Sequence, residues 1–140
     1  MIYNELTRTC FENADCAGTA SGPDWFRGEA GGRSRGTWVQ FDVQVKLEEG
    51  NADEGNSDEG RSKEGGTIRS VRFLAFGCPH VIAAAQWLAE RAVGLPARAQ
   101  LPESVQSLRR RFEVPIEKLG RLLVVEDAWV AALRGATRAD

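Results

Sequence analysis

The chain has 140 residues, of which 42% are hydrophobic, and it carries a formal net charge of −2 at pH 7. These values predict a single globular domain over residues 1–140 and argue against nucleic acid as the main partner. No apolar run approaches the roughly 20 residues that span a membrane, and the start does not resemble a signal peptide. The three cysteines, Cys10, Cys16 and Cys78, lack the spacing of a disulfide framework. We therefore expect a cytoplasmic protein with reduced thiols and no membrane partner.

A short helix is predicted at residues 3–13, where Leu6, Cys10 and Phe11 fall near one face. A helix of this length is marginal alone, so it has to dock on the rest of the fold. A glycine-punctuated loop follows it as far as Asp24.

Two strands are expected next. Residues 25–30 favour a short first strand, and the glycines around residues 33–35 mark a flexible turn: Gly28, Gly31, Gly32 and Gly36. Residues 37–47 alternate apolar and polar side chains. This alternation is typical of a strand with one buried face and one face in water.

Residues 48–66 form an acidic segment of low complexity. A Glu-Gly pair recurs every five residues, and the segment holds seven acidic and two basic side chains, a local charge of −5. Because the whole chain is at −2, the remainder carries +3. The composition predicts a disordered, charge-extended loop. A tolerated expansion of a surface loop is favoured over an acidic tether for a basic partner.

The rest of the chain is organised around residues 66–94. A strand pattern at its start gives way at Gly77 to a helix pattern over residues 80–93. Pro79 suits the first helical position, because its missing N–H would have no partner there. Cys78 then falls at the N-cap, where free backbone N–H groups and the helix dipole favour an anion. A thiol at this place ionises more easily than a free one.

Two more helices are predicted after this corner. Residues 104–112 form a short one, whose arginine run at residues 109–111 indicates a solvated face. Residues 116–134 form a long amphipathic helix that ends at Gly135. Its apolar side consists of Leu119, Leu122, Leu123, Val125, Ala128, Trp129, Ala132 and Leu133. The order of helix, three antiparallel strands and helices predicts an α+β two-layer sandwich.

In this order, several motifs resemble those of the U-type iron–sulfur cluster scaffold proteins, IscU and the N-terminal domain of NifU. Glu12-Asn13 with Gly18 is similar to the end of that family's opening helix, and Glu126-Asp127-Ala128 to the Glu-Asp-Ala of its last helix. Phe76-Gly77-Cys78 resembles the Tyr-Gly-Cys that ends its third strand. The stretch where the family carries the Leu-Pro-Pro-Val-Lys gripped by its chaperone is here Val114, Pro115, Ile116, Glu117 and Lys118.

The resemblance implies a SufE/NifU-like fold, a three-stranded antiparallel sheet packed by helices. It also implies a role in iron–sulfur cluster assembly, with a cysteine desulfurase or a chaperone as partner. Of the three ligand cysteines of the family, the resemblance keeps only Cys78, and it places the other two on Arg35 and Arg121. Arginine stays protonated and cannot ligate a metal. We expect Arg35 and Arg121 to converge on Cys78 and to stabilise a thiolate, a persulfide or another anion.

Three interpretations of Cys78 stay open: a packed residue without chemistry, a sulfur acceptor or metal ligand in iron–sulfur biogenesis, and a site for another anion or metal. A zinc set of Cys10, Cys16, Cys78 and His80 is an alternative, although its spacing lacks the paired pattern of structural zinc sites. No phosphate loop, nucleophile elbow or suitably spaced carboxylate pair indicates an enzyme. The sequence therefore predicts a non-enzymatic, diverged scaffold or accessory protein of iron–sulfur cluster assembly. The alternative is a partner-binding or regulatory protein that retains only the fold.

Overall fold

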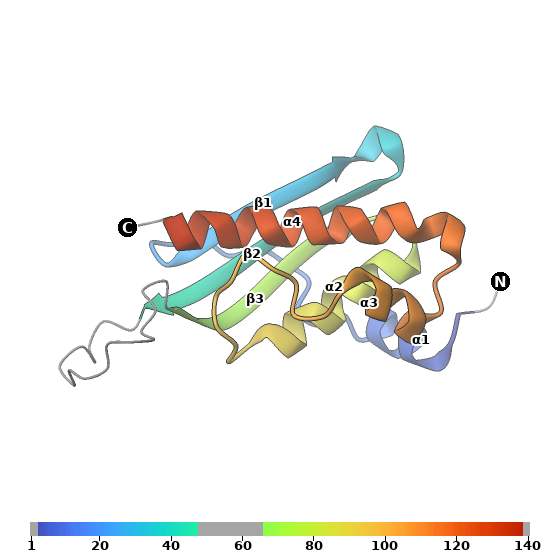
Figure 1. The fold of residues 1–140 in the computed structure, drawn as a ribbon, viewed down its shortest axis with the longest axis horizontal. Helices are drawn as coiled ribbons and strands as arrows, with labels where there is room; N and C mark the ends of the chain where they lie inside the picture. Colours follow the sequence, from blue (N-terminus) through green and yellow to red (C-terminus); the bar gives the residue numbers. More distant parts are fainter. Residues whose placement is uncertain (1–2, 48–65, 139–140) are drawn as a thin grey trace.

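The computed structural model describes residues 3–47 and 66–138 and has an α+β fold (Figure 1). One antiparallel sheet has the order β1-β2-β3, with β1 at Trp25–Gly32, β2 at Thr37–Leu47 and β3 at Gly66–Phe76. The helices are α1 (Glu5–Glu12), α2 (Pro79–Ala92), α3 (Val105–Phe112) and α4 (Leu119–Arg138), with single 3-10 turns η1 (Arg33–Arg35) and η3 (Ile116–Lys118). The predicted sheet packed by helices is confirmed. Apart from Gly66, the predicted acidic loop lies outside the described residues.

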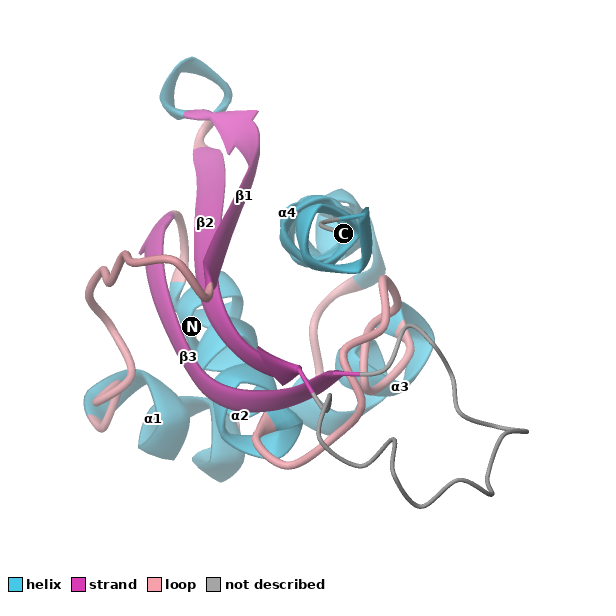
Figure 2. Ribbon diagram, turned by 90° about the vertical axis from the view of Figure 1, so that its left-hand side faces the viewer, coloured by secondary structure: helices cyan, strands magenta, loops and turns pink. Residues whose placement is uncertain are grey.

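The helices α4 and α2 cover one face of the sheet. Helix α4 runs along β1 and β2, while α2 packs on β3 (Figure 2). From β2, Val39, Phe41 and Val43 point to this face and are fully buried. The Phe41 ring meets the buried Trp129 of α4 edge to face at a centroid distance of 5.2 Å. Burial of each such side chain stabilises the fold by about 2 kcal/mol, so this layer is the main core.

Gly28 lies within β1 and faces α4, so its assignment to a flexible turn was wrong. It pairs with Phe41 in the sheet register, and a Cβ built on it would lie 2.2 Å from the backbone nitrogen of Ala132. Only a residue without a side chain lets the helix backbone rest directly on the strand. The first strand is also longer than predicted, because it continues through Gly31 and Gly32.

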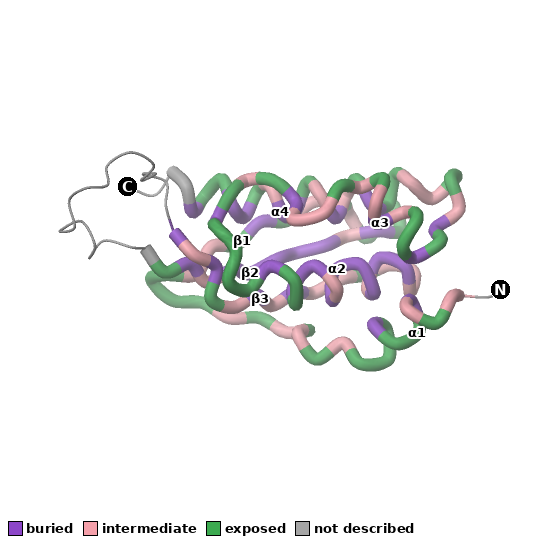
Figure 3. The backbone as a smooth tube through the Cα atoms, turned by 60° about the horizontal axis from the view of Figure 1, so that its bottom comes forward, coloured by how far each residue is buried: buried purple, intermediate pink, exposed green. Residues whose placement is uncertain are grey.

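The second face of β2 is not in water, contrary to the prediction from its alternation. Asp42 is 1% exposed and Gln40 is also buried, so β2 is buried over nearly all of its length (Figure 3). The Asp42 carboxylate accepts hydrogen bonds from Nε and Nη2 of Arg27 at 2.8 and 3.1 Å, and from the backbone N–H of Ala20 at 3.0 Å. The loop before β1 and the Arg27 side chain therefore cover this face, and the buried charge is paired as burial requires.

The last helix begins and ends differently from its prediction. Residues 116–118 form the separate turn η3, and α4 continues past Gly135 to Arg138. Gly135 does not end the helix, because it packs beside Phe26 of β1. Leu123 is 45% exposed, although its spacing placed it on the apolar side.

The first helix also departs from the pattern at one position. Cys10 is buried, but Phe11 is 41% exposed. Asn4 caps α1 by accepting a hydrogen bond from the N–H of Thr7 at 2.8 Å, and its own amide donates to the carbonyl of Arg111 at 3.0 Å. The helix is thereby held against the end of α3, as its short length demands.

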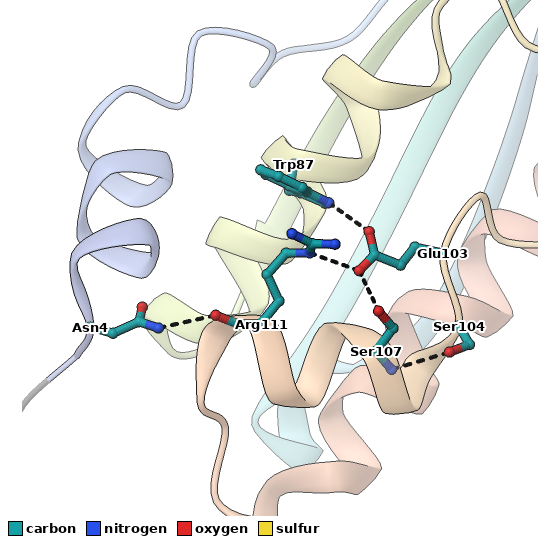
Figure 4. A network of polar contacts seen from close by, with 6 residues as sticks. All are labelled: Asn4, Trp87, Glu103, Ser104, Ser107 and Arg111. Atoms are coloured by element: carbon teal, nitrogen blue, oxygen red, sulfur yellow. Dashed lines mark hydrogen bonds and ion pairs between the residues drawn. The ribbon is translucent and has the colours of Figure 1, made fainter.

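A carboxylate network fixes α3 against α2 (Figure 4). Glu103 accepts hydrogen bonds from Trp87 Nε1 at 3.1 Å, Ser107 Oγ at 2.6 Å and Arg111 Nε at 2.7 Å. The Arg111 guanidinium also lies 4.6 Å from the Trp87 ring centroid. One member of the arginine run thus has a structural role and does not simply face solvent. In residues 3–47 and 66–138, no helix is both long and apolar enough to cross a membrane.

Candidate functional site

The corner between β3 and α2 forms as predicted. Strand β3 ends at Phe76, α2 begins with Pro79 at its first position, and Cys78 is the N-cap in an extended conformation. The carbonyl of Cys78 accepts the first backbone hydrogen bonds of the helix, from Val81 at 3.0 Å and Ile82 at 3.3 Å. The free N–H groups of the first turn therefore point toward the side of the Cys78 thiol.

The Cys78 thiol lies among donors and cations from two parts of the chain. Burial alone would raise its pKa, but the backbone N–H groups of Val81 and His80, the Arg121 guanidinium and the Lys118 ammonium together lower it. The neutral thiol makes no capping hydrogen bond of ordinary geometry. A thiolate is a much stronger acceptor, so ionisation would tighten these contacts. The arrangement favours a thiolate or another anion at this place.

The other two cysteines have the opposite character. Burial raises the pKa of the Cys10 thiol in the core and of the Cys16 thiol beside Gln86. Within the described residues, no three His, Cys, Asp or Glu side chains gather as a metal site would require. The zinc set that combined Cys10, Cys16, Cys78 and His80 is therefore wrong, because Cys10 and Cys16 do not gather with Cys78 and His80.

His80 follows Cys78 in the first turn of α2 and is only 3% exposed. Its ring packs edge to face on Tyr3 at a centroid distance of 4.8 Å, and its Nδ1 atom is buried without a hydrogen-bond partner in the described chain. Burial, Lys118 and Arg121 lower the pKa of the imidazole. His80 is thus a neutral ring beside the same two cations that act on Cys78.

The two predicted arginines are placed differently. Arg121 is in contact with the Cys78 sulfur, whereas Arg35 is exposed in η1, at the tip of the β1–β2 hairpin. Among the described residues, the groups that shift the pKa of Cys78 do not include Arg35. The tip does approach the corner, since the carbonyl oxygen of Gly36 lies 3.6 Å from a Cβ built on Gly77.

Lys118 was predicted only as part of a docking segment, yet it acts on the thiol. A signal in the sequence could have found it, because Lys118 and Arg121 are three residues apart across a helical start and so share one face. The rest of the docking segment is mixed. Val114 is 2% exposed and belongs to the core, whereas Ile116 is 63% exposed in η3. The surface offered to a partner is therefore centred on Ile116.

Comparisons with known proteins rest on shape. No family model matches the sequence, and no curated protein matches it. Among solved structures, the chain is similar to the crystal structure of a protein proposed as the iron–sulfur cluster assembly scaffold of the SUF system in the thermophile Fervidobacterium islandicum AW-1. The TM-score is 0.60 at 13% identity, over 94% of this chain and 96% of that one. The fold is that of a cluster scaffold. At this identity, the likeness shows the fold alone.

The scaffold fold allows a test of whether the corner suits a resident metal or cluster. Iron–sulfur clusters and structural zinc need several thiolate or imidazole ligands. At this corner, Cys78 has Lys118 and Arg121 as neighbours, and both cations repel a metal ion. In the part of the chain that is described, the donor set does not fit a resident cluster or zinc ion.

Proposed function

We propose that this protein is a scaffold-like accessory protein of iron–sulfur cluster assembly that accepts sulfur on Cys78. The cationic surroundings of Cys78 carry this proposal: Arg121 and Lys118 come from the start of the last helix, and two backbone N–H groups come from α2. The likeness to a cluster scaffold over 94% of the chain supports the pathway. We expect the protein to bind neither nucleic acid nor membrane in this role.

The transfer follows from the chemistry of the thiolate. Cys78 Sγ attacks the terminal sulfur of a persulfide held by a cysteine desulfurase. A new sulfur–sulfur bond forms on Cys78, the donor's sulfur–sulfur bond breaks, and the donor cysteine leaves as a thiolate. The product is a persulfide anion, which Arg121 and the N-terminal N–H groups of α2 stabilise by the same contacts that favour the thiolate.

Partner docking is proposed at residues Val114, Pro115, Ile116, Glu117 and Lys118. The exposed Ile116 side chain offers an apolar contact, and the exposed Glu117 adds a charge next to it. Lys118 joins this surface to the thiol corner, because it acts on Cys78. A desulfurase or a chaperone-type partner on this surface would therefore lie beside the sulfur.

The test incubates the reduced protein with a cysteine desulfurase and L-cysteine, followed by mass spectrometry of the intact chain. We expect the mass of one added sulfur on the parent and on Cys16→Ser, and no addition on Cys78→Ser. Reconstitution with iron and sulfide provides the second measurement, and we expect no cluster absorbance in the visible range. Absorbance that depends on Cys78 would instead make the protein a cluster-holding scaffold. Absence of any sulfur addition, with Cys78→Ser still binding the partner, would support the regulatory alternative.

A further inference from the structure

Four side chains from two distant segments form one cluster at the start of α2. Cys78 and His80 belong to the first turn of α2, Lys118 to η3 and Arg121 to the first turn of α4. Lys118 and Arg121 act on both Cys78 and His80, so the four groups share one environment. Two positive charges and the N-terminus of a 14-residue helix there face a single nucleophilic sulfur. The cluster has more positive charge than one thiolate neutralises.

His80 adds an independent sign of a missing ligand. Its side chain is 3% exposed, yet Nδ1 has no hydrogen-bond partner within the described residues. Buried polar atoms are nearly always paired, so an unpaired one requires an explanation. With its proton on Nδ1, the neutral imidazole is a donor, and an oxygen atom of a bound anion would satisfy it.

We infer that this cluster binds thiosulfate, a dianion that carries its own transferable sulfur, and takes that sulfur onto Cys78. The inference rests on the proposed function, because the same thiolate accepts sulfur in both cases. The sulfonate end of thiosulfate matches the charges of Lys118 and Arg121, and its oxygens match the free donor of His80. The outer sulfur then faces Cys78. A simple oxyanion such as sulfate would satisfy the cations but would give the thiolate nothing to attack.

The step balances without an external oxidant. The thiol proton leaves to solvent, and the thiolate electron pair attacks the outer sulfur of thiosulfate. The new bond joins Cys78 Sγ to that sulfur, and the sulfur–sulfur bond of thiosulfate breaks with its electron pair on the departing sulfite. Cys78 becomes a persulfide, and sulfite is released in equal amount. Cyanide, added as an acceptor, would remove the sulfur as thiocyanate and regenerate the thiolate.

The experiment mixes the reduced full chain with thiosulfate alone and measures sulfite release and intact mass. We expect one sulfite and one added sulfur per chain, with neither in Cys78→Ser. Arg121→Gln and Lys118→Gln should each slow sulfite release by about 10-fold, as the loss of a charge-assisted contact predicts. His80→Phe, which keeps a ring against Tyr3, should raise the thiosulfate concentration for half-maximal rate. The matched control is Arg98→Gln, an exposed arginine after α2, which should react at the parent rate.

The outcomes separate this inference from the proposed function. If a desulfurase delivers sulfur to Cys78 while thiosulfate yields no sulfite, the thiosulfate site is refuted and the accessory role stands. If thiosulfate reacts and the desulfurase does not, the site is supported and the accessory role is contradicted. Parent rates in both Arg121→Gln and Lys118→Gln would overturn the inference. An equal loss in Arg98→Gln would do so too, because the effect would then reflect net charge alone.

Discussion

Replacing Gly28 by alanine puts a methyl group into the backbone of α4. A Cβ at this position would lie 2.2 Å from the nitrogen of Ala132 and 2.5 Å from the carbonyl oxygen of Ala128. Ordinary contact between such atoms begins at about 3.5 Å. Both atoms belong to the main chain of a helix, so no rotation of a side chain can relieve the clash.

The size of the effect follows from this geometry. Helix α4 would have to withdraw from β1 by about 1 Å to restore contact distances. That movement loosens the layer in which Trp129 and Leu133, both fully buried, pack on the sheet. Overpacking of a core costs about 1–3 kcal/mol, and here the obstruction is rigid, so we expect a loss of about 3 kcal/mol. The melting temperature should fall by about 10 °C.

Urea unfolding of Gly28→Ala, followed by circular dichroism, measures this loss. The matched control is Gly135→Ala, which adds the same methyl group within α4. There a Cβ meets only Phe26 Cδ1 at 3.8 Å, an ordinary contact. Alanine is favoured over glycine in a helix by about 1 kcal/mol, so this variant should be more stable than the parent. Equal stability of Gly28→Ala and the parent would refute the direct contact between α4 and β1.

Three further predictions concern charged groups. Arg121→Gln should raise the pKa of the Cys78 thiol and so slow its alkylation by iodoacetamide near neutral pH; an unchanged pH–rate profile would contradict the contact. Asp42→Asn should cost about 2 kcal/mol in urea unfolding, because its buried charge accepts three hydrogen bonds, and a change within error would show that these bonds are dispensable. Burial would raise the pKa of Glu103, but hydrogen bonds from Ser107, Arg111 and Trp87 lower it below 4.5, so its stabilising effect is present above that pH and is lost as pH falls through the lower folded value. Glu103→Gln should remove this part of the pH dependence, and identical stability–pH curves for variant and parent would rule it out.

The thiol corner was predictable because its signals are local. The alternation of β3, Pro79 at the first helical position and the helix pattern after it place Cys78 at the N-cap without any knowledge of the rest of the fold. The spacing of Lys118 and Arg121 likewise puts two cations on one face. That this face meets Cys78 depends on how the start of α4 docks near α2. No pattern within either segment specifies that contact, and the family resemblance supplied it for Arg121 alone.

The sequence by itself determined where strands and helices lie, because their hydrophobic periods of 2 and 3.6 residues are written in neighbouring positions. It also determined the one cysteine that sits at a helix start. Only the tertiary structure decided that Gly28 is a contact rather than a hinge, that Asp42 is buried and paired, and that Arg35 stays in solvent while Lys118 reaches the thiol. These outcomes depend on distances between segments far apart in the chain. Packing of whole layers sets such distances, and no single segment encodes them.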